Sequence, residues 1–178
     1  MTQARTGGTD ELRPTLIEVY NLYRTALLNR KYYARRLAGW RWWNMVCEVA
    51  LALGTSGTIA TWAVWKTGLG EYAWTFVAAF TAILAVLKPI IQLTKGIERY
   101  SKLYIGHSDL FYDLQGMVAE IQRTHNFSAE MISAIKSARG RFKKLALDDD
   151  PTPNPPQVRE CYNEVNREIP PESLWVPN

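Results

Sequence analysis

VALALGTSGTIATWAVW, residues 49–65, contains no charged side chain, and neither does YAWTFVAAFTAILAVL, residues 72–87. With its flanking residues each run approaches the roughly 20 residues of helix that cross a hydrocarbon layer about 30 Å thick. Only the six residues from Lys66 to Glu71 separate the runs, which is the length of a turn. The sequence therefore predicts an all-α membrane hairpin of two transmembrane helices with polar flanks.

Composition by itself does not reveal the hairpin. The 178 residues are 47% hydrophobic and 21% charged, with a net charge of +4, which also suits one soluble domain. The alternative is that both runs are buried helices of a soluble bundle. Core helices usually keep a polar stripe, and these two show almost none, so the hairpin is favoured. A signal peptide fits poorly, because the first run begins only after residue 41.

Basic residues gather on one side of the expected hairpin. Five precede the first run with no acid among them, and four close or follow the second: Arg30, Lys31, Arg35, Arg36 and Arg41, then Lys88, Lys95, Arg99 and Lys102. The connecting loop carries one charge of each sign. Cationic flanks stay on the cytoplasmic side of a membrane. We therefore expect both termini in the cytoplasm and the loop outside.

Apolar residues recur at three- and four-residue spacing on both sides of the hairpin, as in amphipathic helices. Ser128 has the residue type and position of a helix cap for 129–147. The expected organisation is a disordered N-terminus (1–9), a cytoplasmic amphipathic helix (10–41), the first span (42–65), an external turn (66–71), the second span (72–93), a cytoplasmic helical stem with a following helix (94–147), a Pro/Asp linker (148–156), and a short helix with a tail (157–178).

The stem carries a seven-residue apolar repeat, the pattern of a helix seated against partner helices. Its members are Ile97, Tyr100, Tyr104, His107, Phe111, Leu114, Val118 and Ile121. We expect the N-terminal helix to pack antiparallel to it, because a short hairpin brings both stems together. We also expect the repeat to join copies of the chain into a homo-oligomer, a tetramer or larger, since two helices alone cannot enclose a conduction path.

Glu48 and Lys88 are the only ionisable residues inside the expected spans, at similar distances from the cytoplasmic ends. A charge at such a position costs a few kcal/mol unless it is paired or hydrated. Three interpretations stay open. The two residues form a structural pair within or between chains, they face a water-filled vestibule, or Lys88 extends to the interface.

Several small and polar residues share helical faces with this pair. Thr55 and Thr58 lie on the face of Glu48, and Thr81 lies seven residues before Lys88. These threonines, with Glu48 and Lys88, are candidate pore residues, and Pro89 is a candidate gate because proline kinks a helix. Thr and Gly are also common in membrane helices for packing alone, and Ala50, Gly54 and Thr58 form a row that permits close helix approach.

The C-terminal part offers two further features. Arg139, Arg141, Lys143 and Lys144 form a basic cluster that either contacts a nucleotide, a nucleic acid or anionic lipid, or is a solvated helix face. Trp175 and Val176 either dock in a neighbouring groove or belong to an untethered end.

No catalytic site, cofactor site or metal site is expected. Cys47 and Cys161 are the only cysteines, they lie in different segments, and the two histidines are isolated. No nucleophile–base pair, phosphate-binding loop or metal cluster is present in the sequence. We therefore do not expect an enzyme.

The lead segment LYRTALLNRKYYARRLAGWRWWN and the stem LKPIIQLTKGIERYSKLYIGHSDLFYDLQGMVAEIQ, with two spans between them, resemble the SLATT proteins. These are two-span membrane effectors associated with bacterial nucleotide-signalling and defence operons. The resemblance covers about Leu12 to Gln122 and leaves the segment after Asn126 unmatched. It implies an oligomeric pore in the bacterial inner membrane that harms or depolarises the host when an infection signal releases it. It also implies control by a nucleotide or oligonucleotide, or by a partner such as a nucleotidyltransferase.

The favoured function is thus a pore-forming or membrane-disrupting effector in antiphage defence. The alternative is a membrane-anchored scaffold that tethers a soluble partner without conducting ions. A conventional ion channel is disfavoured, because no selectivity-filter sequence is present and the outer loop is too short to build one.

Overall fold

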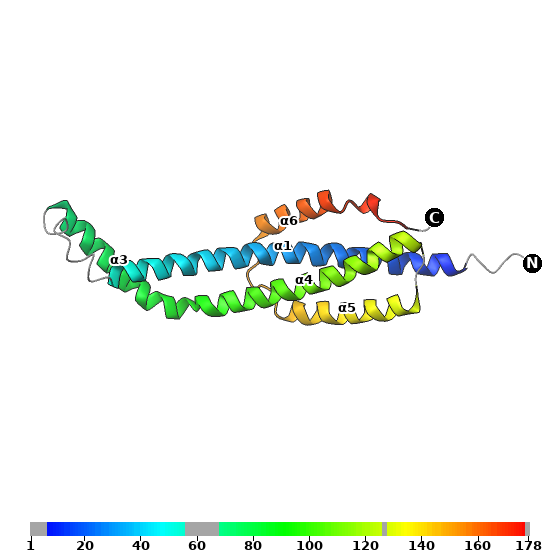
Figure 1. The fold of residues 1–178 in the computed structure, drawn as a ribbon, viewed down its shortest axis with the longest axis horizontal. Helices are drawn as coiled ribbons and strands as arrows, with labels where there is room; N and C mark the ends of the chain where they lie inside the picture. The colour runs from blue at the N-terminus through cyan, green and yellow to red at the C-terminus, as the bar shows by residue number, and fades with distance from the viewer. Residues whose placement is uncertain (1–6, 56–67, 126–127, 177–178) are drawn as a thin grey trace, which may run out of the picture. The chain divides into compact units, whose positions relative to one another are not determined.

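The computed structural model describes residues 7–55, 68–125 and 128–176, and these residues form helices without any β-strand (Figure 1). The predicted all-α class is confirmed for this part of the chain. The elements are α1 (Gly7–Thr55), α3 (Leu69–Ile91), α4 (Leu93–Thr124), α5 (Ala129–Leu147), α6 (Pro155–Glu168) and the 3-10 turn η2 (Pro171–Ser173). They divide into two compact units. The bundle unit combines residues up to Arg35 with those from Tyr100 onward, and the apolar unit spans Arg36–Arg99.

In the bundle unit, α1 and α4 pack against each other through aromatic side chains. Tyr23 stacks on Phe111 with ring centroids 5.1 Å apart, and Tyr33 stacks on His107 at 5.3 Å. Positions on α4 therefore fall as positions on α1 rise, so the two helices are antiparallel. The predicted antiparallel packing of the N-terminal helix against the stem is confirmed.

The third helix of the bundle unit is α5, which runs antiparallel to α4. Arg141 forms an ion pair with Asp113 at 2.7 Å, and the ring of Phe142 meets that of His107 edge-on at 5.8 Å. The Ser128 hydroxyl accepts a hydrogen bond from the Met131 amide at 3.3 Å and so caps the helix. Both the cap and the bounds 129–147 agree with the sequence prediction.

One apolar core joins these helices. Its buried members are Leu16, Val19, Tyr20, Tyr23, Ala26 and Leu27 from α1, Leu110, Phe111, Leu114, Val118 and Ile121 from α4, Ile135 and Ala138 from α5, and Val165 from α6. Burial of a large apolar side chain stabilises a fold by about 1.5–3 kcal/mol. Most of the seven-residue repeat of the stem is thus used inside a single chain.

The C-terminal segment closes the bundle unit. The Asn154 side chain accepts a hydrogen bond from the Gln157 amide at 3.4 Å, and prolines fill the first turn of α6, where a missing amide hydrogen is tolerated. The helix therefore begins at Pro155, two residues earlier than expected, and the linker is shorter. Cys161 and Val165 are the buried side chains of α6, which lies alongside α1 in Figure 1.

In the apolar unit, α1 continues without a break to Thr55, and α3 ends at Ile91. Gln92 then adopts a left-handed conformation, with φ 51° and ψ 46°, before α4 begins. Pro89 lacks the amide hydrogen that the carbonyl of Ala85 would accept, which weakens the last turn of α3. The helix thus ends two residues after Pro89, the position at which the sequence predicts a kink.

Among the described residues, no helix taken singly has the length and apolar composition of a membrane span. Thr75–Lys88 and Leu93–Thr124 meet these criteria together, with a bend of 55° between them. Much of the expected first span (56–65), and the start of the expected turn (66–67), lie outside the described residues.

Candidate functional site

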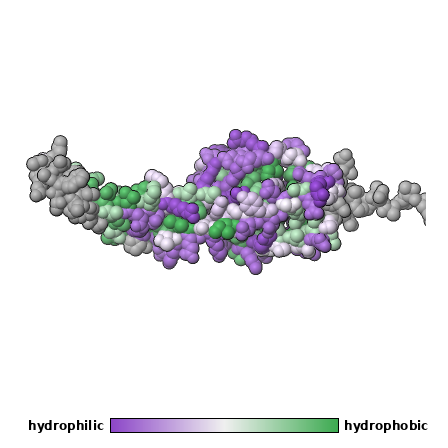
Figure 2. Space-filling model, in the orientation of Figure 1, coloured by the Kyte–Doolittle hydropathy of each residue, from purple (hydrophilic) through white to green (hydrophobic). Residues whose placement is uncertain are grey.

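The apolar unit exposes large hydrophobic side chains over most of its described length. They are Trp42, Trp43, Met45, Val49 and Leu53 on α1, and Tyr72, Phe76, Val77, Phe80, Ile83, Val86, Leu87, Ile90 and Ile91 on α3. Phe76 is 75% exposed. Figure 2 shows the hydrophobic colour gathered over this part of the molecule. An exposed apolar surface of this size marks a contact with a membrane or a partner.

Glu48 and Lys88 meet within this apolar surface. The Lys88 ammonium donates a hydrogen bond to the Glu48 carboxylate at 2.5 Å, which joins α1 to α3. Pairing within one chain, the first of the three interpretations, is thus observed. Both side chains remain partly exposed, 57% for Glu48 and 28% for Lys88, so the pair lies at the surface of the unit.

The two helices come close together where Gly54 faces Thr81. A methyl group added at Gly54 would lie 2.7 Å from the Thr81 Cβ. Thr81 is buried, and its hydroxyl donates to the Val77 carbonyl at 2.7 Å. In a single chain Thr81 therefore packs against α1 and does not line open space. Thr58 and the side chains of Thr55 and Pro89 lie outside the described residues, so their assignment to a pore or gate stays a prediction.

Substitution of Gly54 by Leu is expected to separate α1 from α3, because the new side chain overlaps Thr81. Overpacking of this kind costs about 1–3 kcal/mol. Engineered cysteines at Glu48 and Lys88, in a Cys47→Ser/Cys161→Ser background, should crosslink readily with Gly54 and poorly with G54L. G54A is the graded control. Equal crosslinking in the proteins with Gly, Ala and Leu at position 54 would contradict the close approach of α1 and α3.

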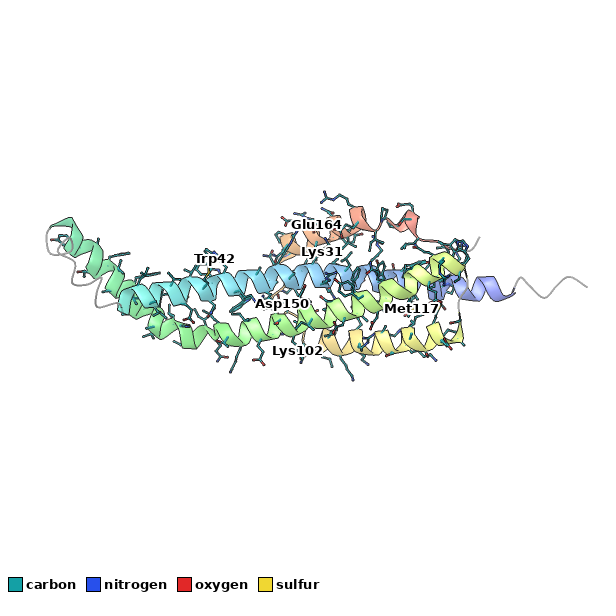
Figure 3. All side chains as sticks on the ribbon, viewed as in Figure 1. Lys31, Trp42, Lys102, Met117, Asp150 and Glu164 are labelled. Carbon is teal, nitrogen blue, oxygen red and sulfur yellow. The ribbon has the colours of Figure 1, made fainter. Side chains whose placement is uncertain are left out.

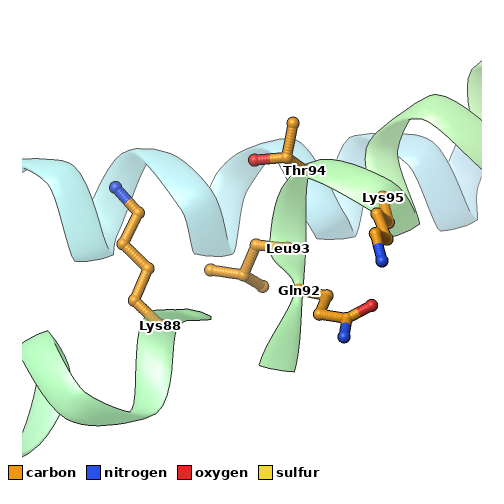
Figure 4. Close-up of a pocket in the computed structure, with 5 residues that line it drawn as sticks. All are labelled: Lys88, Gln92, Leu93, Thr94 and Lys95. Atoms are coloured by element: carbon orange, nitrogen blue, oxygen red, sulfur yellow. The ribbon is translucent and has the colours of Figure 1, made fainter. Parts of the chain in front are cut away.

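A recess of about 340 Å³ lies at the break between α3 and α4 (Figure 4). Lys88, Gln92, Leu93, Thr94 and Lys95 line it. Gln92, Leu93 and Thr94 were not among the residues expected to matter. The sequence does contain a pattern that points to this break, since a proline between Lys88 and Lys95 indicates a helix end with cationic flanks.

The stem residues have a different environment from the one expected. Tyr100, Phe111, Leu114, Val118 and Ile121 are buried in the bundle unit, and Ile97 and Tyr104 are half-buried. Their assignment to an interface between copies therefore needs correction, because α1 and α5 of the same chain already cover this stripe.

The basic cluster of α5 is partly neutralised. Arg139 forms an ion pair with Glu18, and Arg141 pairs with Asp113 at 2.7 Å. Lys143 and Lys144 are exposed. Two of the four cations thus hold α5 to its neighbours, which favours the solvated-face interpretation over a dedicated anion site.

The C-terminal tail is docked on its own chain. The Tyr20 hydroxyl donates to the Trp175 carbonyl at 2.6 Å, and the His125 ring lies 4.7 Å from that of Trp175. Of the two interpretations of Trp175 and Val176, docking is observed, with α1 and the end of α4 as the receiving surface.

Ion pairs between α1 and α6 were not anticipated from the sequence. Lys31 binds Glu168 at 2.5 Å and Glu164 at 3.3 Å, and Figure 3 shows Lys31 and Glu164 beside each other. Arg35 binds Glu164 at 2.5 Å and Glu160 at 3.0 Å. The hydrogen bond to Glu168 raises the pKa of Lys31, and the hydrogen bond from Lys31 lowers the pKa of Glu164.

A buried polar group holds the linker after α5 against α1. The Tyr32 hydroxyl donates to Asp150 at 2.7 Å, and the Tyr33 hydroxyl donates to Asp149. Next to them, His107 is 2% exposed, and its Nδ1 has no hydrogen-bond partner among the described residues. Burial lowers the pKa of His107 to about 4, although the nearby Asp149 opposes this shift. The imidazole is therefore neutral at pH 7.

Within the described part of the chain, no group of His, Cys, Asp and Glu side chains has the arrangement of a metal site. Comparison with known protein families, curated proteins and solved structures gives no match to this chain.

Proposed function

We propose that this protein is an oligomeric membrane effector whose apolar unit enters the bacterial inner membrane and makes it permeable, in antiphage defence. The observation that carries the proposal is the exposed apolar surface of α1 and α3, which contrasts with the buried apolar residues of the bundle unit. Water does not favour such a surface, whereas lipid or sister copies would cover it. We further propose that both termini are cytoplasmic, since the flanking residues are basic.

The Glu48–Lys88 pair is the feature we connect with permeability. An unpaired charge within the span costs a few kcal/mol on insertion scales, so the pair is expected to hold α1 and α3 together. Its partial exposure on the apolar surface supports a role in a conduction path that sister copies would share. A nucleotide, an oligonucleotide or a nucleotidyltransferase is the proposed controlling signal, on the basis of the resemblance to SLATT proteins.

Purified protein in liposomes tests this function directly. The native chain is expected to release an entrapped dye or dissipate an ion gradient. Glu48→Gln should raise the release rate by about tenfold, the equivalent of 1.4 kcal/mol, because the broken pair no longer holds the two helices closed. Lys88→Ala should act in the same direction.

Lys143→Ala is the matched control, since Lys143 is an exposed cation on α5. It should leave the release rate unchanged. Equal rates for all variants would contradict a role of the Glu48–Lys88 pair in permeation.

The alternative is a membrane-anchored scaffold, in which the apolar unit tethers the bundle unit to a soluble partner. The large fraction of the chain in the bundle unit favours this candidate. The same liposomes separate the two functions: a scaffold inserts, as flotation would show, but releases no dye at any protein density.

A further inference from the structure

Helix α6 presents a row of carboxylates to a row of cations on α1. Glu160, Glu164 and Glu168 are four residues apart and so share one face of α6. They meet Lys31 and Arg35, which are also four residues apart. The two rows match in spacing and opposite charge, which is how a basic helix face recognises an acidic amphipathic helix.

The match is incomplete at Arg24, which lies two turns before Lys31 on the same face of α1. Arg24 donates a hydrogen bond to the side-chain oxygen of Asn166, which is a neutral amide. Its Nε is buried and has no hydrogen-bond partner among the described residues. A carboxylate accepts two parallel hydrogen bonds from a guanidinium, and a single amide oxygen does not. The face of α1 is therefore better suited to a more acidic helix than to α6.

The contacts of α6 are also of a kind that can be exchanged. The paired side chains are 23–70% exposed, and exposed ion pairs contribute about 0–1 kcal/mol each. Pro151 and Pro153 precede the helix, and Pro170 and Pro171 follow it. Cys161 and Val165 are its buried side chains. Elements with few buried contacts open at lower free energy than the core.

We infer that the face of α1 formed by Arg24, Lys31 and Arg35 is a docking surface for an acidic amphipathic helix of a partner protein, and that α6 occupies this surface as an internal substitute. The partner helix carries carboxylates at the positions of Glu160, Glu164 and Glu168, and a further carboxylate at the position of Asn166. Its binding displaces α6 and so regulates the effector. The regulatory part rests on the proposed function, whereas the docking surface does not.

A labelled peptide of residues 154–176 carrying Asn166→Asp is the probe. We expect it to bind the full-length chain in detergent, measured by fluorescence anisotropy, about tenfold more tightly than the native peptide. Tenfold corresponds to about 1.4 kcal/mol, the gain expected when a neutral acceptor becomes charged. The control peptide carries Glu160→Lys, Glu164→Lys and Glu168→Lys and should not bind.

Hydrogen exchange in the same samples locates the binding. The N166D peptide should accelerate exchange of the α6 amides of the chain, because α6 is displaced. Asn166→Asp in the chain itself should have the opposite effect. It should slow exchange of the α6 amides and weaken binding of the peptide about tenfold. Equal binding of the acidic and lysine peptides, or binding without faster exchange in α6, would overturn the docking surface.

Dye release from proteoliposomes then reports on regulation alone. We expect the N166D peptide to raise release by the native chain. If dye is released but the release rate does not change when the peptide is bound, the proposed regulation by displacement of α6 is overturned. Absence of release from every sample counts against the proposed function and leaves the binding result as it stands.

Discussion

Leu114→Asp is expected to unfold the bundle unit. Leu114 lies on α4 and is fully buried in the core that α4 shares with α1 and α5. Loss of a buried leucine costs about 2–5 kcal/mol, and an uncompensated carboxylate in the same position adds several more. The total is comparable to the 5–15 kcal/mol that stabilise a typical domain. Far-UV circular dichroism should show the loss of helix, and limited proteolysis should cut α4 and α5.

Ala119→Asp is the matched control, because Ala119 is exposed on the same helix. It should leave the spectrum and the proteolytic pattern unchanged. The comparison also separates two roles of the seven-residue repeat. If the repeat joined copies, L114D would give a folded monomer. Since the structure places Leu114 inside one chain, an unfolded or degraded chain is expected, and a well-folded monomer would contradict that placement.

The sequence predicted those features of the fold that depend on neighbours along the chain. The bounds of α5 follow from the Ser128 cap and from apolar spacing, and the antiparallel packing of α1 and α4 follows from the short connection. The sequence left three interpretations of Glu48 and Lys88 open. Pairing was one of them, because two opposite charges at similar distances from the ends of adjacent helices can bring their side chains within reach.

The remaining features depend on which helices meet. A seven-residue repeat predicts that a helix packs against other helices, but it does not say whether they belong to the same chain. Here α1 and α5 have apolar stripes of their own and cover α4. The carboxylate row of α6 is visible as Glu160, Glu164 and Glu168, yet its partner Lys31 lies more than a hundred residues earlier. No local pattern connects the two.

Acidification between pH 6.5 and 4.5 is expected to destabilise the bundle unit through His107. The ring is enclosed by Tyr33 and Phe142, and burial lowers its pKa from 6.5 to about 4. The unfolded chain binds a proton in this range and the folded chain does not, so stability falls as the pH falls. The loss between these two pH values is about 2 kcal/mol, at 1.36 kcal/mol per pKa unit. Native-state hydrogen exchange of α4 amides measures it.

The pH range identifies the group responsible. Glu164 has a pKa below its ordinary value of 4.5, so its contribution to stability is present above that pH and is lost only below it. Asp149 is the acid that faces His107, and it opposes the depressed pKa without removing it. His107→Gln keeps a polar side chain of similar size but does not titrate. This variant is therefore expected to lose the pH dependence above 4.5, even where its stability at pH 7 is lower. A slope that persists unchanged in the variant would show that His107 is not buried as a neutral ring.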